Sequence, residues 1–134
     1  MKPSDKTRER YTDFANAVTR VREAYDRDWV ATGDTFVRDA LIQRFEVAFD
    51  TAWKLLKGFL GEVHGIEVVS PLTAIQEATA IGVLTDTTTW LAMKNTRNET
   101  SHIYSEEVAV RATTHMGEYV VALETLRDTL HDLI

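Results

Sequence analysis

The most apolar long stretch of the chain runs from residue 36 to residue 60 and reads FVRDALIQRFEVAFDTAWKLLKGFL. Its large apolar residues recur every three or four positions, which is the spacing of one face of an α-helix. This face is wider than one packing partner requires, so the pattern predicts contacts on two sides, with a bundle neighbour and with a second subunit. We expect a long helix over 36–60 that Gly61 and Gly65 end.

Helical spacing continues on both sides of this stretch. A first helix is predicted over 11–25, and the residues at 32–34 break the pattern and supply caps for the next helix. Ser70-Pro71 joins an N-cap serine to a proline at the first helical position, which predicts a short helix that Gly82 stops.

The sequence of the C-terminal part of the chain predicts two more helices. Asp86 is expected to cap a fourth helix, and a fifth is expected to begin near Ser105 and to continue without a break to about residue 130. The chain is therefore expected to form one all-α domain over residues 1–134. Its predicted architecture is an up-and-down four-helix bundle with an additional short helix, and we expect it to be dimeric.

The composition narrows the class of protein. A net charge of −6 argues against a general nucleic-acid coat protein, although it leaves room for a small local cationic site. The chain has no cysteine, which excludes disulfides and thiolate metal sites. Residues 1–6 are too polar for a signal peptide, and no apolar run reaches transmembrane length. We expect a cytoplasmic protein that has no membrane contact, no metal and no cofactor.

The segment with the most chemistry lies between the fourth and fifth predicted helices and reads RNETSHIY over residues 97–104. Arg97 and His102 can together cleave a phosphodiester without a metal, because arginine stabilises phosphate charge and histidine exchanges protons near neutral pH. The spacing by itself is weak, since chance expects about one such match in a chain of this composition. On one continuous helix the two side chains would also lie about 140° apart.

The residues between them change this geometry. Asn98, Thr100 and Ser101 favour caps and turns over helix interiors. If the fourth helix ends here, Arg97 lies in its last turn and His102 on the connection, and both side chains can converge in one cleft. Asn98 and Ser101 are then expected to orient the histidine or to hold the turn.

A structural interpretation remains open for each of these residues. A polar segment between helices is usually a loop, and an arginine near a helix C-terminus usually complements the helix dipole. Arg44 falls within the apolar run of the central helix, where it is expected to make a structural hydrogen bond or ion pair, or else to line the cleft. Glu99 and His102 spell Glu-x-x-His, but a di-iron site needs a second copy that the chain lacks. The other histidines favour structural roles: His64, His115 and His131. Trp53 and Trp90 are expected in the core, and Lys54 and Lys57 on the solvated surface.

Several blocks of the sequence together resemble a known family. They are Arg44-Phe45-Glu46-x-x-Phe49-x-x-Ala52-Trp53-Lys54, then Ser70-Pro71, Trp90-Leu91 and Arg97-Asn98-x-Thr100-Ser101-His102-x-Tyr104. In this order they resemble the nucleotidyltransferase substrate-binding proteins, a branch of the HEPN superfamily. The resemblance covers about residues 10–132.

The resemblance implies a dimeric helical bundle that pairs with a minimal nucleotidyltransferase as the toxin half of a toxin–antitoxin pair. It also implies metal-independent endoribonuclease activity through an Arg-x4-His motif, matched here by Arg97 and His102. A third implication is AMPylation of a tyrosine by the partner, and the matching position is Tyr104. The alternative is a non-catalytic partner subunit that binds a nucleotide or another substrate in the same cleft.

Overall fold

The structure is a computed structural model that describes residues 2–102 and 105–134. All regular elements in these residues are helices, which confirms the predicted all-α class. Their bounds are α1 Asp5–Asp26, α2 Trp29–Thr32, α3 Thr35–His64, α4 Pro71–Ala80, α5 Thr87–Thr100, α6 Glu106–Thr113 and α7 Met116–His131.

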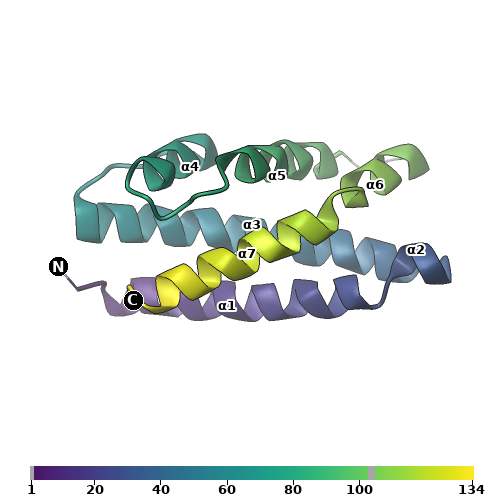
Figure 1. Cartoon of the computed structure of the whole chain (residues 1–134), viewed down its shortest axis with the longest axis horizontal. Helices are drawn as coiled ribbons and strands as arrows, with labels where there is room; N and C mark the ends of the chain where they lie inside the picture. The colour runs from purple at the N-terminus through teal and green to yellow at the C-terminus, as the bar shows by residue number, and fades with distance from the viewer. Residues whose placement is uncertain (1, 103–104) are drawn as a thin grey trace.

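The long helix α3 lies in the middle of the molecule (Figure 1). Helix α1 packs along it and also against α7, whereas α4 and α5 cover its other side. The short helices α2 and α6 lie at the end where α3 begins, and both chain termini lie at the opposite end (Figure 1). The site segment between α5 and α6 is therefore at the α2 end of the bundle.

Aromatic side chains of α3 join the two sides of the bundle. The ring of Phe45 stacks on Tyr119 of α7 with centroids 5.5 Å apart, and Phe49 lies 6.2 Å from Trp90 of α5. Trp90 is 1% exposed, which confirms it as a core residue. Burial of such large rings, together with the aliphatic side chains around them, supplies the hydrophobic driving force for the fold.

The predicted helix ends agree with the structure at most positions. Asp34 accepts hydrogen bonds from the first backbone N–H groups of α3, and Ser70 caps α4 in the same way. Gly65 ends α3 in the left-handed conformation (φ 66°), which favours glycine. The expectation that Gly61 also ends this helix is wrong, because α3 continues to His64.

The prediction of one uninterrupted fifth helix is also wrong. The chain instead forms α6 and α7, with a break at residues 114–115. The hydroxyls of Thr113 and Thr114 both donate to the carbonyl of Val110, and the backbone N–H of Thr114 bonds three residues back to Arg111. Such threonine contacts do not by themselves break a helix, because Thr51 and Thr125 make them inside α3 and α7. The break carries in addition a hydrogen bond from Trp29 to the hydroxyl of Thr113.

No helix among the described residues is both long and apolar enough to cross a membrane. The same residues hold no cluster of three or more histidine and carboxylate side chains suited to a metal ion.

Candidate functional site

Helix α5 ends where the sequence predicted. Its last helical residue is Thr100 and Ser101 is its C-cap, so Arg97 occupies the last turn. The break in the helix follows from the polar residues of this segment, which lose little by leaving the helix. Arg97 therefore lies within one turn of the connection that carries His102.

Two carboxylates of α3 hold the guanidinium of Arg97. Asp50 accepts hydrogen bonds from Nε and Nη2 at 3.0 and 3.1 Å, and Glu46 accepts one from Nη1 at 2.7 Å. The hydrogen bond to Asp50 is the main reason why the pKa of Arg97 is raised above its ordinary value. Two parallel hydrogen bonds to one carboxylate, as Arg97 makes to Asp50, fix the plane of the guanidinium as well as its position.

The turn after α5 adds a fourth contact to this group. Ser101 accepts a hydrogen bond from Nη1 of Arg97 at 3.2 Å, and buried Thr100 donates to the same Glu46 oxygen at 3.0 Å. Ser101 thus contacts the arginine, whereas the sequence also allowed it to orient the histidine. We call Arg97, Glu46, Asp50 and Thr100 the Arg97 cluster.

His102 and Asn98 lie at the surface beside this cluster, and both are exposed. The backbone N–H of His102 donates to the carbonyl of Glu99, which continues the turn past the helix end. The imidazole is therefore open to a ligand, whereas Arg97 is turned toward α3. The convergence of the two side chains in one cleft stays a prediction. Tyr104 lies outside the described residues.

Two further arginines of α3 make structural contacts, which for Arg44 is one of the two expected alternatives. Arg44 points to α1, where its Nη1 donates to the carbonyl of Arg20 at 2.8 Å, so it does not join the Arg97 cluster. The buried arginine of this helix is Arg38, which the sequence analysis missed. Its guanidinium donates to both Glu106 oxygens and lies 5.6 Å from the ring centroid of Trp29.

A cleft of about 500 Å³ adjoins the Arg97 cluster between α3 and the start of α6. Glu46 and Thr100 belong both to the cluster and to the wall of this cleft. The remaining lining residues are Arg38, Asp39, Ile42, Gln43, Ser105, Glu106 and Ala109. A ligand in this cleft would therefore touch the residues that hold Arg97.

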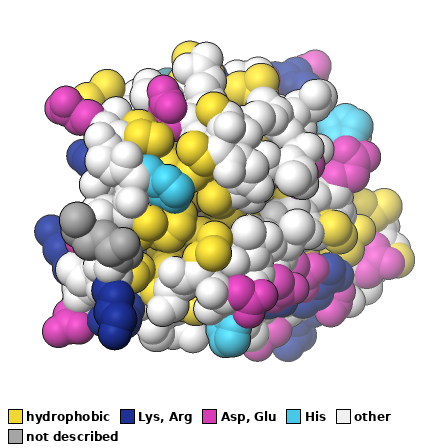
Figure 2. All heavy atoms as spheres, turned by 60° about the vertical axis from the view of Figure 1, so that its left-hand side comes forward, with side chains coloured by type: hydrophobic (Ala, Val, Ile, Leu, Met, Phe, Trp, Pro, Cys, Tyr) yellow, Lys and Arg dark blue, Asp and Glu magenta, His cyan; other side chains and the backbone are white. Residues whose placement is uncertain are grey.

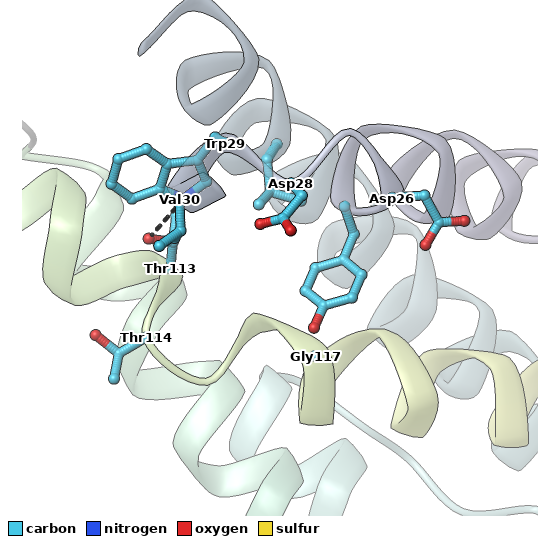
Figure 3. A pocket seen from close by; sticks show the side chains of 9 residues that line it. Asp26, Asp28, Trp29, Val30, Thr113, Thr114 and Gly117 are labelled. Carbon is cyan, nitrogen blue, oxygen red and sulfur yellow. Dashed lines mark hydrogen bonds between the residues drawn. The ribbon is translucent and has the colours of Figure 1, made fainter. Parts of the chain in front are cut away.

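A different cavity, of about 380 Å³, lies where α6 ends and α7 begins (Figure 3). Asp26 and Asp28 line one side of it, and Thr114 and Gly117 line the other (Figure 3). A hydrogen bond of 3.2 Å from Trp29 Nε1 to Thr113 Oγ1 joins the two sides. Neither Arg97 nor His102 is among the described residues that line this cavity.

Figure 2 brings forward the end of the molecule with the chain termini, which lies opposite the site segment. On the face shown in Figure 2, apolar side chains gather near the centre, and basic and acidic side chains alternate around them. This face has no broad basic surface of the kind that general nucleic-acid binding requires.

The family comparison covers nearly the whole chain. Residues 9–132 match the family described as nucleotidyltransferase substrate binding protein like. The chain belongs to this family. It is 26% identical over 125 residues to a Haemophilus influenzae protein named probable ribonuclease HepT, with 87% of this chain and 86% of the relative covered.

Solved structures share the fold. A Thermus thermophilus protein is 32% identical, with a TM-score of 0.79 over 87% of this chain and 98% of its own. A Shewanella oneidensis HEPN toxin, solved tri-AMPylated in complex with an MNT antitoxin, has 12% identity and a TM-score of 0.76, covering 96% and 98%. A Haemophilus influenzae protein described as having the fold of a nucleotidyltransferase substrate binding domain has 22% identity and a TM-score of 0.72, covering 93% and 98%.

The sequence alone assigned no role in the site to Asp50 or Arg38. Glu46 appeared there only as part of one block of the family resemblance. A signal for the carboxylates was present, because Glu46 and Asp50 interrupt the apolar run four residues apart and so share one helix face. For Arg38 the sequence holds no comparable signal.

Proposed function

We propose that this chain is a HEPN-type toxin that cleaves RNA without a metal ion. The observation that carries the proposal is the fixed guanidinium of Arg97, one turn from an exposed histidine in the matching Arg-x4-His spacing. A charged donor that is oriented before the substrate arrives stabilises a transition state without the cost of reorganisation. Membership in the family and the relative named probable ribonuclease HepT support the same activity.

The proposed reaction is transesterification at phosphorus. His102 accepts the proton of the ribose 2′-hydroxyl as that oxygen forms a bond to the adjacent phosphorus. Arg97 stabilises the charge on the phosphoryl oxygens, and the bond to the 5′-oxygen breaks. That oxygen takes a proton from water or from a second acid, which gives a 2′,3′-cyclic phosphate and a free 5′-hydroxyl.

A second chain is part of the proposal, because one chain leaves Arg97 turned toward its own carboxylates. Phe36 and Val47 on the outer ridge of α3 are 87% and 50% exposed, and Val47 directly follows Glu46 of the Arg97 cluster. A homodimer along this ridge would cover both apolar side chains and bring two motifs together. Light scattering should show twice 15.2 kDa for the wild type. Val47→Glu should shift the protein to monomer and the matched control Val121→Glu on α7 should not.

The test of the activity is RNA cleavage in excess EDTA. The wild type should cleave, whereas His102→Ala should lose about 10²–10³ in rate, as is typical when one oriented group is removed. His131→Ala is the matched control, because this exposed histidine lies at the end of α7. Equal cleavage by the wild type and His102→Ala would contradict the assignment.

A nucleotidyltransferase is the proposed partner and Tyr104 the proposed acceptor of AMP. A phosphodiester-linked AMP near the motif would add negative charge that competes with RNA for Arg97 and would fill space beside it. Intact-mass measurement with the cognate enzyme, ATP and Mg²⁺ should show the AMP increment on the wild type and on Tyr25→Phe. Tyr104→Phe should show none, and an increment on that variant would refute this acceptor.

One observation favours a non-catalytic alternative, in which the chain only binds a nucleotide for its partner. Arg97 makes four hydrogen bonds within its own chain, three of them to carboxylates. A guanidinium so engaged has few donors left for a phosphate. Nucleotide binding without cleavage of any RNA, by a protein shown to be dimeric, would support this second function.

A further inference from the structure

The cleft between α3 and α6 has an apolar floor and a polar rim. Ile42 and Ala109 are 5% and 2% exposed and form, with Ala112, a small buried cluster separate from the main core. Around them the rim carries the amide of Gln43 and the hydroxyls of Thr100 and Ser105, together with charged groups. A flat apolar ring with polar edges fits such a lining.

The charge of the cleft excludes a phosphate. It is lined by one arginine and three carboxylates, those of Asp39, Glu46 and Glu106. Arg38 is bonded to both Glu106 and Asp39, and its hydrogen bonds hold the pKa of Glu106 below the ordinary value. The lining therefore holds more carboxylates than cationic groups, and the cleft as a whole is acidic. An anionic group would be repelled, whereas a neutral group rich in hydrogen-bond donors would be attracted.

Asp39 has spare capacity to accept such donors. Its side chain is 64% exposed, and Arg38 Nε occupies only Oδ1, at 3.0 Å. Among the described residues no donor is found for Oδ2. A carboxylate accepts two parallel N–H groups particularly well, because its two oxygens match a pair of adjacent donors. Guanine presents such a pair, N1–H and the exocyclic N2–H, on its Watson–Crick edge, whereas adenine and cytosine present one donor beside an acceptor.

We propose that this cleft binds a guanine base and that Asp39 is the residue that selects it. The inference rests on the proposed function, because the base would belong to a nucleotide adjoining the phosphate held at Arg97. Glu46 lies between the two positions, since it contacts Arg97 and lines the cleft. The guanine ring lies on Ile42 and Ala109, Asp39 accepts from N1–H and N2–H, and the Gln43 amide donates to O6. Single-stranded RNA is commonly read in this way, by stacking or apolar contact and by hydrogen bonds to the Watson–Crick edge.

The first experiment measures binding of nucleosides, so it does not depend on cleavage. Guanosine titrated into ¹⁵N-labelled protein should shift the backbone amides of Ile42 and Ala109 and the side-chain amide of Gln43. Inosine, which differs only by lacking the exocyclic amine, should bind about tenfold more weakly, as expected for one lost hydrogen bond in a matched pair. Asp39→Asn should remove the difference between guanosine and inosine, and Asp13→Asn on α1 is the matched control. The exposed position of Asp39 allows the variant to fold. Gln43→Ala provides a second variant, which should weaken the binding of guanosine and inosine equally, because both bases carry O6.

The second experiment measures cleavage of short RNAs that carry one guanosine, inosine, adenosine or uridine on either side of the scissile bond. Preferred cleavage beside guanosine that is lost in Asp39→Asn is the expected result. Guanosine binding without cleavage of any RNA would keep the inference and overturn the ribonuclease proposal. Cleavage with equal rates for all bases and no nucleoside shifts at Ile42 or Ala109 would overturn the inference and keep the ribonuclease. Absence of both would overturn both.

Discussion

Arg38 lines the cleft between α3 and α6 and Arg97 lies beside it, and each bonds to two carboxylates in different surroundings. The side chain of Arg38 is 6% exposed and its partners Asp39 and Glu106 are mostly in solvent. The side chain of Arg97 is 25% exposed and its partners are themselves partly buried.

The difference indicates what each arginine does. Arg38 also lies over the Trp29 ring, so its burial ties α2, α3 and α6 together, and its carboxylates serve mainly to satisfy it. Arg97 contributes little to the core and remains within reach of a ligand, so its carboxylates set its orientation. Similar ion clusters thus serve a structural role at Arg38 and, in the proposed function, a catalytic role at Arg97.

Replacement of Arg97 by alanine should show the difference between the two arginines most clearly, because it should lower the cleavage rate much more than the stability. We expect Arg97→Ala to lower the rate of RNA cleavage by about 10²–10³, because the transition state loses its cation. The melting temperature should change by only a few degrees, since the lost ion pairs are partly exposed. Single-turnover cleavage and calorimetry measure the two quantities on one sample. A loss of folding in Arg97→Ala would erase the contrast with Arg38.

Arg38→Ala should show the opposite pattern. It removes the contact with Trp29 and the ion pair to Glu106, so the free energy of unfolding should fall by about 1–2 kcal/mol. Hydrogen exchange should accelerate in α6 more than in α1, because α6 is held by few apolar contacts. Denaturant unfolding measures the first effect, and Arg44→Ala is the control, since its side chain bonds to α1. Unchanged exchange in α6 would show that Arg38 does not hold this helix.

Asp50→Asn tests whether the carboxylates around Arg97 compete with an RNA phosphate for its guanidinium. Removing one of the two negative charges on Arg97 leaves an acceptor but reduces competition with phosphate. Affinity for a non-cleavable RNA, with 2′-O-methyl groups, should therefore rise about tenfold, or about 1.4 kcal/mol. Fluorescence anisotropy at fixed ionic strength measures it. Asp128→Asn on α7 changes the net charge equally and should leave the affinity almost unchanged; an equal gain there would assign the effect to overall charge.

The smallest expected effect is the contribution of the ion pair between Arg38 and Glu106 to the pH dependence of stability. The hydrogen bond from Arg38 lowers the pKa of Glu106 in the folded protein, so the unfolded chain binds a proton at higher pH than the folded one. Its stabilising contribution is present above the unfolded value, about 4.3, and is lost as the pH falls through the lowered folded value. Melting curves from pH 7 to pH 3 should show this acid sensitivity reduced in Glu106→Gln. An identical pH dependence of both proteins would exclude a role for this pair.

Much of the site was predictable from local sequence, because helix ends depend on neighbouring residues. The polar residues at 98–101 indicated the end of α5, and the structure ends the helix at Thr100. The carboxylates that hold Arg97 were not predictable in this way, since they are 47 and 51 residues distant in the chain. Their approach depends on the register between α3 and α5, and periodicity carries no information about register.

The sequence by itself determined the helical class, the position of the long central helix and the motif at residues 97–104, because apolar spacing and capping preferences act over a few residues. Tertiary structure alone decided which arginine is buried and where the last helix breaks. Arg38 and Arg44 occupy the same helix, and only the packing of α2 and α6 buries the first. The break at residue 114 likewise involves Thr113, whose hydroxyl accepts from Trp29 across 84 residues of chain. Such contacts form only after the helices have packed, so they cannot be predicted from the pattern of neighbouring residues.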